Sequence, residues 1–173
     1  MHVRLMPTIG LILALSSASA LHAQSNVHFG VSGGIALPIG DLGDASNVGF
    51  DLGARITAPL SSPSWGLRGD LNWNRFGGKA GVNSYSFLSL AGNLVHRDSG
   101  ARLYEFFGPG VYNRKIELTN GFNTSHTDLG LQGGVGLDMN ASDLKTFVEF
   151  GLTSVFSSGS NSIWFPVRFG IRF

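Results

Sequence analysis

The chain has 173 residues, with 12 Lys plus Arg against 11 Asp plus Glu, 25 Gly and no Cys. This length predicts a single domain. The absence of Cys excludes disulfide frameworks and thiolate metal sites, and a net charge of +1 gives no basic field for binding nucleic acid. Charged residues make up 13% of the chain, about half the share of a soluble domain, yet no transmembrane helix can follow the N-terminal region.

The N-terminal region has the layout of a secretory signal peptide. Arg4 precedes an apolar stretch over residues 9–15, and small residues follow at positions 16–20. We expect a signal peptide over residues 1–23 and a mature domain over residues 24–173. Cleavage after Ala23 is favoured, and Ala18-Ser19-Ala20 offers a second site after Ala20. The alternative, a buried N-terminal helix of a cytosolic protein, fits the three-part pattern less well.

From Val27 onward, apolar residues alternate with polar or small ones, which is the pattern of β-strands. The C-terminal segment is the clearest case, because every second residue from Ile163 to Phe173 is apolar and the residues between include Arg168 and Arg172. The same reading predicts eight strands, near residues 27–37, 50–57, 65–74, 84–96, 103–112, 128–139, 145–156 and 163–173.

In two of these strands, the sequence pattern does not show which residues lie on the apolar face. In 84–96, Tyr85 and Phe87 have one parity, and Leu88, Leu90 and Leu94 have the other. In 103–112, we take Glu105 to mark the polar face. That choice puts Tyr104, Phe106 and Tyr112 on the apolar face. It leaves two apolar residues, Phe107 and Pro109, on the polar face.

The connections predict a membrane barrel. Short connections are expected at 59–64, 97–100, 140–143 and 157–161, and longer loops at 38–48 and 113–127. An even number of strands puts both termini at one end, which suits a barrel whose short turns face the periplasm and whose longer loops face outward. Strands of about 9 to 11 residues also match a tilted membrane strand.

Alternation alone does not say whether the apolar face points inward, as in a lipocalin, or outward to lipid. Composition favours lipid, because the polar face carries small residues that suit a narrow interior: Gly30, Ser32, Gly34, Gly53, Gly130, Gly134, Gly136 and Gly170. The apolar face carries bulky aromatic residues at several strand ends, as in the girdles of outer-membrane barrels: Trp65, Trp73, Phe156 and Phe173.

Three segments resemble the small outer-membrane β-barrel family, the relatives of the OmpA and OmpX barrels: residues 33–42, 90–95 and 166–173. The resemblance implies an all-β, eight-stranded antiparallel transmembrane barrel with a polar, packed interior. Its setting would be the bacterial outer membrane, among lipid and lipopolysaccharide. In that family the terminal strand ending in Phe is the signal read by the outer-membrane assembly machinery, and the matching positions here are Phe169, Ile171 and Phe173.

Charges of both signs share the polar face and are expected to form a network in the lumen: Asp51, Arg55, Arg68, Asp70, Glu105, Asp128, Glu149, Arg168 and Arg172. Burial of an unpaired charge costs several kcal/mol, so these residues are expected to pair, with Glu149 beside Arg168 or Arg172 on the neighbouring strand. A salt-bridged plug is the favoured interpretation. A catalytic or gated carboxylate is the alternative.

The remaining motifs indicate no chemistry. No second His stands at metal-ligand spacing from His28, His96 or His126, and the Gly-x-Gly patterns have no helix after them, so no metal or cofactor is expected. The segment His126-Thr127-Asp128 loosely resembles the Ser-His-acid set of barrel enzymes that trim lipid A. Ser125 or Thr127 would supply the hydroxyl, and the acidic partner would have to come from another strand. We therefore expect a non-enzymatic structural or surface-interaction protein, with a lipid A-modifying enzyme and a narrow pore as alternatives. The sequence identifies no partner for the outer loops.

Overall fold

The computed structural model describes residues 27–62, 64–141 and 144–173. The expected signal peptide therefore lies outside the described residues. In the described ranges, no helix is long and apolar enough to cross a membrane.

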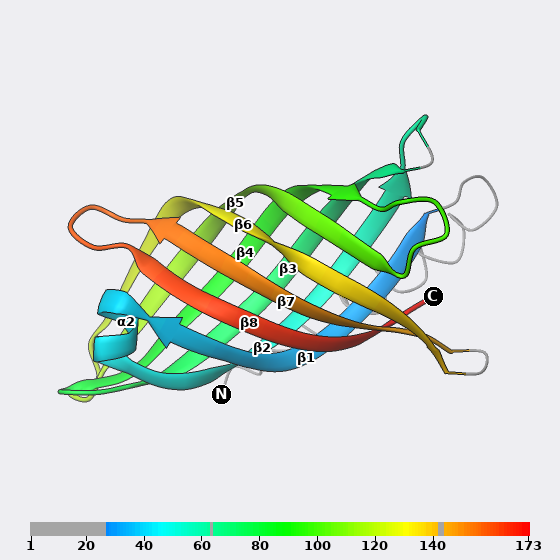
Figure 1. Ribbon diagram of the computed structural model, residues 1–173. Helices are drawn as coiled ribbons and strands as arrows, with labels where there is room; N and C mark the ends of the chain where they lie inside the picture. Colours follow the sequence, from blue (N-terminus) through cyan, green and yellow to red (C-terminus); the bar gives the residue numbers. More distant parts are fainter. Residues whose placement is uncertain (1–26, 63, 142–143) are drawn as a thin grey trace, which may run out of the picture.

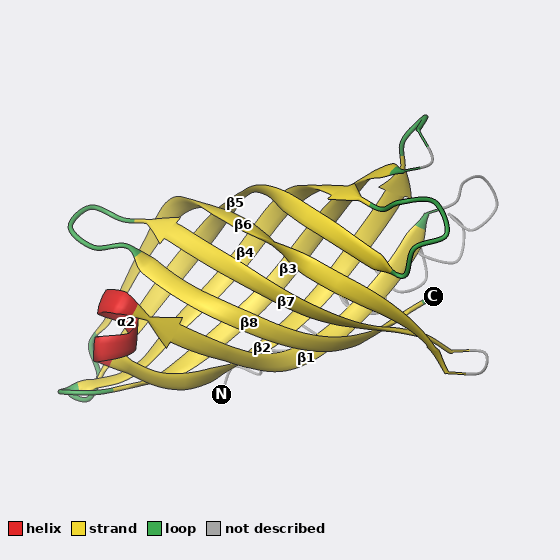
Figure 2. Ribbon diagram, viewed as in Figure 1, coloured by secondary structure: helices red, strands yellow, loops and turns green. Residues whose placement is uncertain are grey.

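Eight antiparallel strands form a closed barrel in which each strand pairs with its sequence neighbours and β1 pairs with β8 (Figure 1). This confirms the predicted fold class. The strands are β1 (His28–Ile39), β2 (Ser46–Pro59), β3 (Trp65–Gly78), β4 (Val82–His96), β5 (Leu103–Leu118), β6 (Asn123–Ala141), β7 (Leu144–Phe156) and β8 (Ser162–Arg172). One short helix, α2 (Gly40–Ala45), joins β1 to β2 (Figure 2).

The barrel has two different ends. At the termini end, β1 begins and β8 finishes, and Phe29 and Phe173 exchange a pair of backbone hydrogen bonds of 2.9 Å that ties the C-terminus into the wall. At the opposite end, the helix end, α2 lies across the edge of the barrel (Figure 2). Because all strands are antiparallel, the connections alternate between these two ends.

The expectation of two longer loops at the helix end was wrong. The segment 38–48 is filled by the end of β1, by α2 and by the start of β2. The segment 113–127 is mostly strand, because β5 and β6 continue to pair until Glu117 faces Asn123 and leave only Thr119–Phe122 as a turn. Polar side chains support this extension, since Asn113 donates a hydrogen bond to Thr127 and Lys115 donates one to Glu117. The result is a long β5–β6 hairpin.

The apolar residues point out of the barrel, which confirms the lipid-facing interpretation. Trp65, Trp73, Phe156 and Phe173 are all exposed, and Leu90 is 64% exposed. In β4 the outward residues are Leu88, Leu90 and Leu94, while Phe87 and Asn93 point inward. The strand is ambiguous in the sequence because large apolar side chains lie on both of its faces, with Phe87 packed inside the barrel and the three Leu residues outside.

The face assigned to β5 was wrong. Glu105 is exposed on the outer wall together with Phe107, whereas Tyr104, Phe106 and Tyr112 are buried in the lumen. Glu105 lies near the start of β5 at the termini end, where it pairs in register with His96. A charge on the lipid face costs little near the membrane interface, so an outward Glu is tolerated at this height and does not mark the inner face.

Inward aromatic rings rest on inward glycines of the next strand. A Cβ added to Gly136 would lie 2.2 Å from the Tyr104 ring, and one added to Gly170 would lie 2.2 Å from the Phe147 ring. The same relationship recurs in three directly opposite pairs: Tyr104 with Gly136, Phe106 with Gly134 and Phe147 with Gly170. The glycines therefore make room for large side chains in a lumen that is too narrow for a second Cβ at these points.

Candidate functional site in the barrel lumen

The carboxylate of Glu149 on β7 lies at the centre of the lumen. Arg55 donates two hydrogen bonds to it, at 2.5 and 2.8 Å, and Arg68 donates a third at 2.7 Å. The Tyr104 hydroxyl donates a fourth at 2.7 Å. All four side chains are buried, so one carboxylate joins residues from four strands through charge-assisted hydrogen bonds.

Asp70 on β3 balances the remaining positive charge. It accepts hydrogen bonds from Arg68 at 2.9 Å, from Asn93 at 2.7 Å and from Gln132 at 3.1 Å. Two guanidinium groups thus face two carboxylates. We call Arg55, Arg68, Asp70, Tyr104 and Glu149 the central network.

A second pair lies beside the central network. Arg168 on β8 donates to both oxygens of Asp51 on β2, at 2.7 and 2.9 Å, and Asn74 donates to the same carboxylate. The expected pairing of Glu149 with Arg168 or Arg172 was therefore wrong, although Glu149 and Arg168 are direct neighbours in register. In this narrow lumen a long Arg side chain reaches carboxylates beyond the adjacent strand, so register does not decide its partner.

Aromatic rings cover the guanidinium groups. The Arg55 guanidinium carbon lies 4.1 Å from the centre of the Phe147 ring, and that of Arg68 lies 4.0 Å from the centre of the Phe106 ring. Such stacking suits Arg, whose weakly hydrated plane tolerates an apolar face. Together with the ion pairs, it fills the middle of the barrel.

Toward the helix end, the lumen is filled by apolar groups. Trp164 on β8 packs against three rings, with centroid distances of 4.8, 5.8 and 6.1 Å to Phe87, Phe76 and Tyr112. We call these four residues the aromatic plug. Leu42 of α2 joins the same buried cluster, so the short helix covers the plug.

At the termini end the lumen opens through a group that we call the mouth: His28, Arg97, Asp138 and Arg172. Arg172 donates a hydrogen bond of 2.9 Å to Asp138, and Arg97 forms an ion pair with the same carboxylate. A cavity of about 250 Å³ lies at this entrance and is lined by residues that include Arg68, Tyr104 and Arg172.

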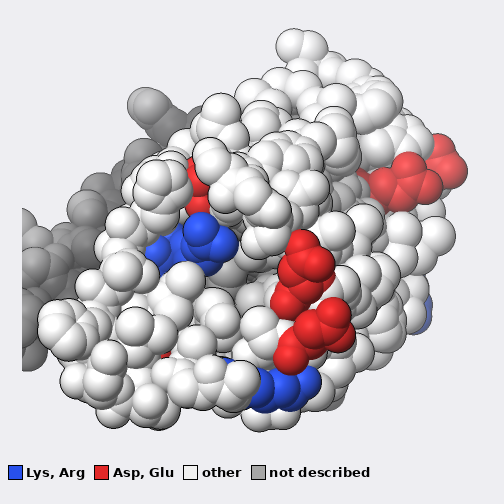
Figure 3. Space-filling view, turned by 90° about the vertical axis from the view of Figure 1, so that its left-hand side faces the viewer, with Lys and Arg blue, Asp and Glu red and all other residues white. Residues whose placement is uncertain are grey.

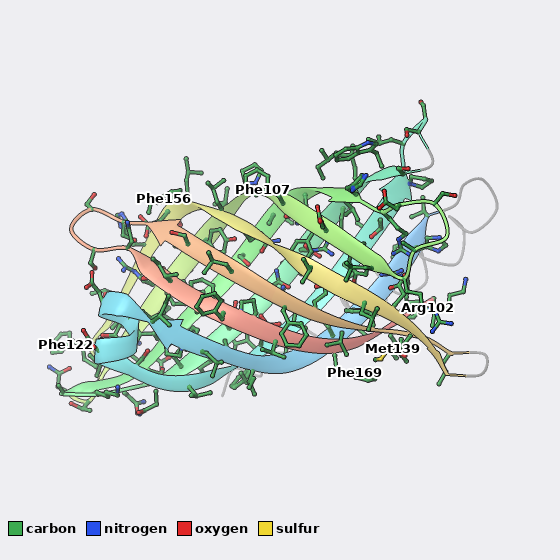
Figure 4. The ribbon with its side chains drawn as sticks, in the orientation of Figure 1. Arg102, Phe107, Phe122, Met139, Phe156 and Phe169 are labelled. Carbon is green, nitrogen blue, oxygen red and sulfur yellow. The ribbon has the colours of Figure 1, made fainter. Side chains whose placement is uncertain are left out.

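The nine expected lumen charges do not form a single group. Six are buried and paired in the middle of the barrel: Asp51, Arg55, Arg68, Asp70, Glu149 and Arg168. Arg172 lies in the mouth, and Asp128 lies toward the helix end, where it accepts a hydrogen bond of 2.7 Å from Ser157. Glu105 lies outside the lumen. Phe169 and Ile171 point outward from β8 toward lipid, and Phe173, which directly follows the strand, is exposed as well (Figure 4 labels Phe169).

The segment around His126 does not have a catalytic arrangement. Ser125 donates its hydroxyl to Asn113 at 3.2 Å, and His126 lies 3.5 Å from Asp128. Ser125 and His126 are consecutive in β6, so their side chains point to opposite faces of the sheet. In the described ranges, no group of three or more His, Asp or Glu residues is placed to hold a metal ion.

Several residues of the lumen were missed in the sequence. Tyr104, Phe106 and Phe147 are aromatic and were assigned to lipid or left unassigned, and Asn74, Asn93 and Gln132 bear no charge. One signal was present, because Leu103, Phe107 and Val111 share a parity in β5 that Glu105 alone contradicts. Weighing those apolar residues against one Glu would have placed Tyr104 and Phe106 inside.

The outer surface of the helix end carries charge of both signs. Seen from that end, Lys and Arg side chains and Asp and Glu side chains form small separate groups, and neither sign covers the face (Figure 3). Phe122, at the tip of the β5–β6 hairpin, is 71% exposed and lies at the far end of the barrel from Arg102 (Figure 4).

Comparison with known proteins gives one family and several structures. Residues 8–172 match the model of the outer membrane protein beta-barrel domain. Neisserial surface protein A (NspA) is 14% identical with a TM-score of 0.59, over 86% of this chain and 96% of that one. The N-terminal β-barrel domain of Pseudomonas aeruginosa OprF is 13% identical with a TM-score of 0.56, over 86% and 98%. Ail, the attachment invasion locus protein of Yersinia pestis, is 17% identical with a TM-score of 0.53, over 84% and 98%. No curated protein matches the chain.

Proposed function

The chain belongs to the outer membrane protein beta-barrel domain family, and from this we propose that it is a non-enzymatic, non-conducting barrel of the bacterial outer membrane that holds a β-hairpin at the cell surface. Its outward apolar face contacts the membrane lipid. The single observation that carries the proposal is the filled lumen, in which the central network and the aromatic plug occupy successive levels.

A filled lumen argues against a pore. Ions would have to pass the Arg55 and Glu149 pair and then the aromatic plug, and a buried pair does not open without a large loss of free energy. We expect purified barrel in planar lipid bilayers to show no discrete conductance steps. A stepwise conductance that persists in single-barrel recordings would contradict the proposal.

The geometry around His126 argues against hydrolysis of lipid A. Its side chain is exposed, and the hydroxyl of Ser125 is directed to Asn113. We expect lipid A extracted from cells with and without the protein to have identical masses. A mass shift that is lost in the His126→Ala variant would establish the enzymatic alternative.

The β5–β6 hairpin is the element that we assign to the surface. It extends farther than its neighbours, with strands of 16 and 19 residues, and it carries the exposed Phe122 at its tip. The fold is shared with a Neisserial surface protein and with an attachment invasion locus protein, which favours a role in surface contact. Lipopolysaccharide would then surround the helix end of the barrel.

An epitope tag tests this orientation in intact cells. A tag placed in the Thr119–Phe122 turn should be labelled by antibody without permeabilisation, and the same tag in the 97–102 connection should be labelled only after permeabilisation. The reverse result would overturn the assignment of the hairpin to the surface.

The assembly machinery of the outer membrane is the other partner that we propose. Phe169, Ile171 and Phe173 form an outward apolar row on the last strand, which is the position of the family's assembly signal.

A further inference from the structure

The mouth carries more positive charge than its carboxylate can neutralise. Arg97 and Arg172 share Asp138, and Arg102 and Lys145 line the same entrance. Four cationic side chains thus face one carboxylate among the residues that line this opening. In the middle of the barrel, by contrast, Arg55, Arg68 and Arg168 face three carboxylates.

The cavity in the mouth offers hydrogen-bond donors that have no acceptor. Arg68 is 3% exposed and lines the cavity, and its Nη2 has no hydrogen-bond partner in the described part of the chain. The Nε of Arg172, which lines the same cavity, is also buried and has no hydrogen-bond partner among the described residues. One acceptor of the mouth, Oδ1 of Asp138, is also unpaired, so two unpaired donors stand against one unpaired acceptor. Because buried donors normally find an acceptor, this excess of donors favours an anion as their partner.

Size and donor type point to a phosphate group. The cavity measures about 250 Å³ and so admits a small polar group rather than a drug-sized ligand, for which about 300 Å³ is the lower limit. Arg68, Arg97 and Arg172 come from three separate segments, and guanidinium groups bind phosphate through paired hydrogen bonds. Several guanidinium groups around one centre suit an oxyanion with more than two oxygens.

The depth of the cavity in the membrane also favours a phosphate ligand. Trp65 lines the cavity and is exposed on the lipid face at the start of β3, where it stacks on His96 with a centroid distance of 4.6 Å. Trp residues at strand ends lie at the level of the lipid headgroups. The cavity therefore lies at the level where lipid phosphates are found.

We propose that the mouth binds one phosphate group, held by Arg68, Arg97 and Arg172, that is either the headgroup phosphate of a lipid or free phosphate. This site is independent of the proposed function, because a filled lumen and a surface hairpin require no ligand at the termini end.

The test uses the mature barrel folded in a maltoside detergent, which contains no phosphate. Inorganic phosphate is titrated at constant ionic strength while the ¹⁵N-labelled Arg Nε–Hε signals are followed by NMR, with chloride as the reference anion. We expect saturable shifts for Arg68, Arg97 and Arg172. Arg97→Gln should weaken phosphate binding about tenfold, since one charge-assisted hydrogen bond is lost.

Arg75→Gln is the matched control, because Arg75 pairs with Glu117 near the helix end and the same charge is removed. It should leave phosphate binding unchanged, and a gel-mobility assay shows that each variant is folded. Equal weakening in Arg75→Gln and Arg97→Gln, or the same shifts with chloride, would overturn the proposal. The proposal would also be overturned if phosphate caused no saturable shift in detergent and the three Arg signals kept their unbound positions in phosphatidylglycerol nanodiscs.

A second arm identifies the source of the phosphate. The barrel is placed in phosphatidylglycerol nanodiscs without inorganic phosphate. If the three Arg signals already have their bound positions and added phosphate has no effect, the ligand is a lipid headgroup. If inorganic phosphate still titrates the signals as in detergent, the ligand is free phosphate. Either result supports a phosphate site.

Discussion

Asp51 and Arg168 form their ion pair across Gly34, which lies between them on β1 and is the register partner of both residues. A Cβ at Gly34 would lie 1.9 Å from the backbone oxygen of Val167 and 2.9 Å from the Cα of Arg168. The missing side chain is therefore what allows β2 and β8, which are not neighbours, to exchange a bidentate ion pair.

Gly34→Ala should destabilise the barrel by about 3 kcal/mol or more, at the upper end of the range for an overpacked core, because a Cβ would collide with backbone that cannot move aside. Gly33→Ala is the control on the same strand, since its Cβ would meet no atom closer than the Leu52 side chain at 3.5 Å. The measurement is urea unfolding of the barrel in lipid vesicles. Equal stability of the two variants would show that the Asp51 and Arg168 pair does not require the gap.

Glu149→Gln should cost about 3 to 5 kcal/mol, because it leaves two buried guanidinium groups without their shared carboxylate. Adding Arg55→Met should recover part of this loss, since Arg68 keeps its bond to Asp70. A double-mutant cycle should therefore give a larger coupling energy for Glu149 with Arg55 than for Glu149 with Arg168. The opposite order would mean that register neighbours, and not the observed partners, determine the pairing.

Glu105→Leu should change the free energy of unfolding by about 1 kcal/mol or less, because Glu105 lies on the outer wall near the interface. Glu149→Leu provides the comparison, since the same replacement inside the lumen removes the centre of the network. Both are measured by urea unfolding in vesicles. A loss at Glu105 as large as that at Glu149 would restore Glu105 to the lumen.

Phe173→Ala should lower the amount of folded barrel in the outer membrane, because Phe173 ends the outward row of β8 and its backbone closes the wall against Phe29. Phe122→Ala is the matched control, with the same change at an exposed hairpin tip. Quantified membrane fractions give the readout. If both variants assemble to the same level, the terminal Phe is not part of the signal.

The folded barrel should also migrate differently from the boiled chain on a detergent gel. A closed ladder has no edge strand from which unfolding can start, so it survives detergent at room temperature. Identical migration before and after boiling would argue against a closed barrel in the purified protein.

The sequence predicted the number of strands and the outward face of most of them, because alternation has a period of two wherever one face meets lipid. It did not predict α2, whose six residues are too few to show helical periodicity. It also assigned the wrong face of β5 to the lumen. A Glu on the outer wall near the membrane interface cannot be told from a lumen Glu when its depth in the membrane is unknown. The partners of Glu149 depend on reach across the lumen, which no local pattern encodes.

The long β5–β6 hairpin has a mechanical consequence. Its ladder runs from the pair of Leu103 with Leu137 to the pair of Glu117 with Asn123, and its hydrogen bonds lie across the strand direction. A pull on the hairpin tip along the barrel axis would load many of these bonds in shear at the same time rather than peel them apart one by one. The hairpin can therefore transmit tension from its tip into the whole circumference of the wall.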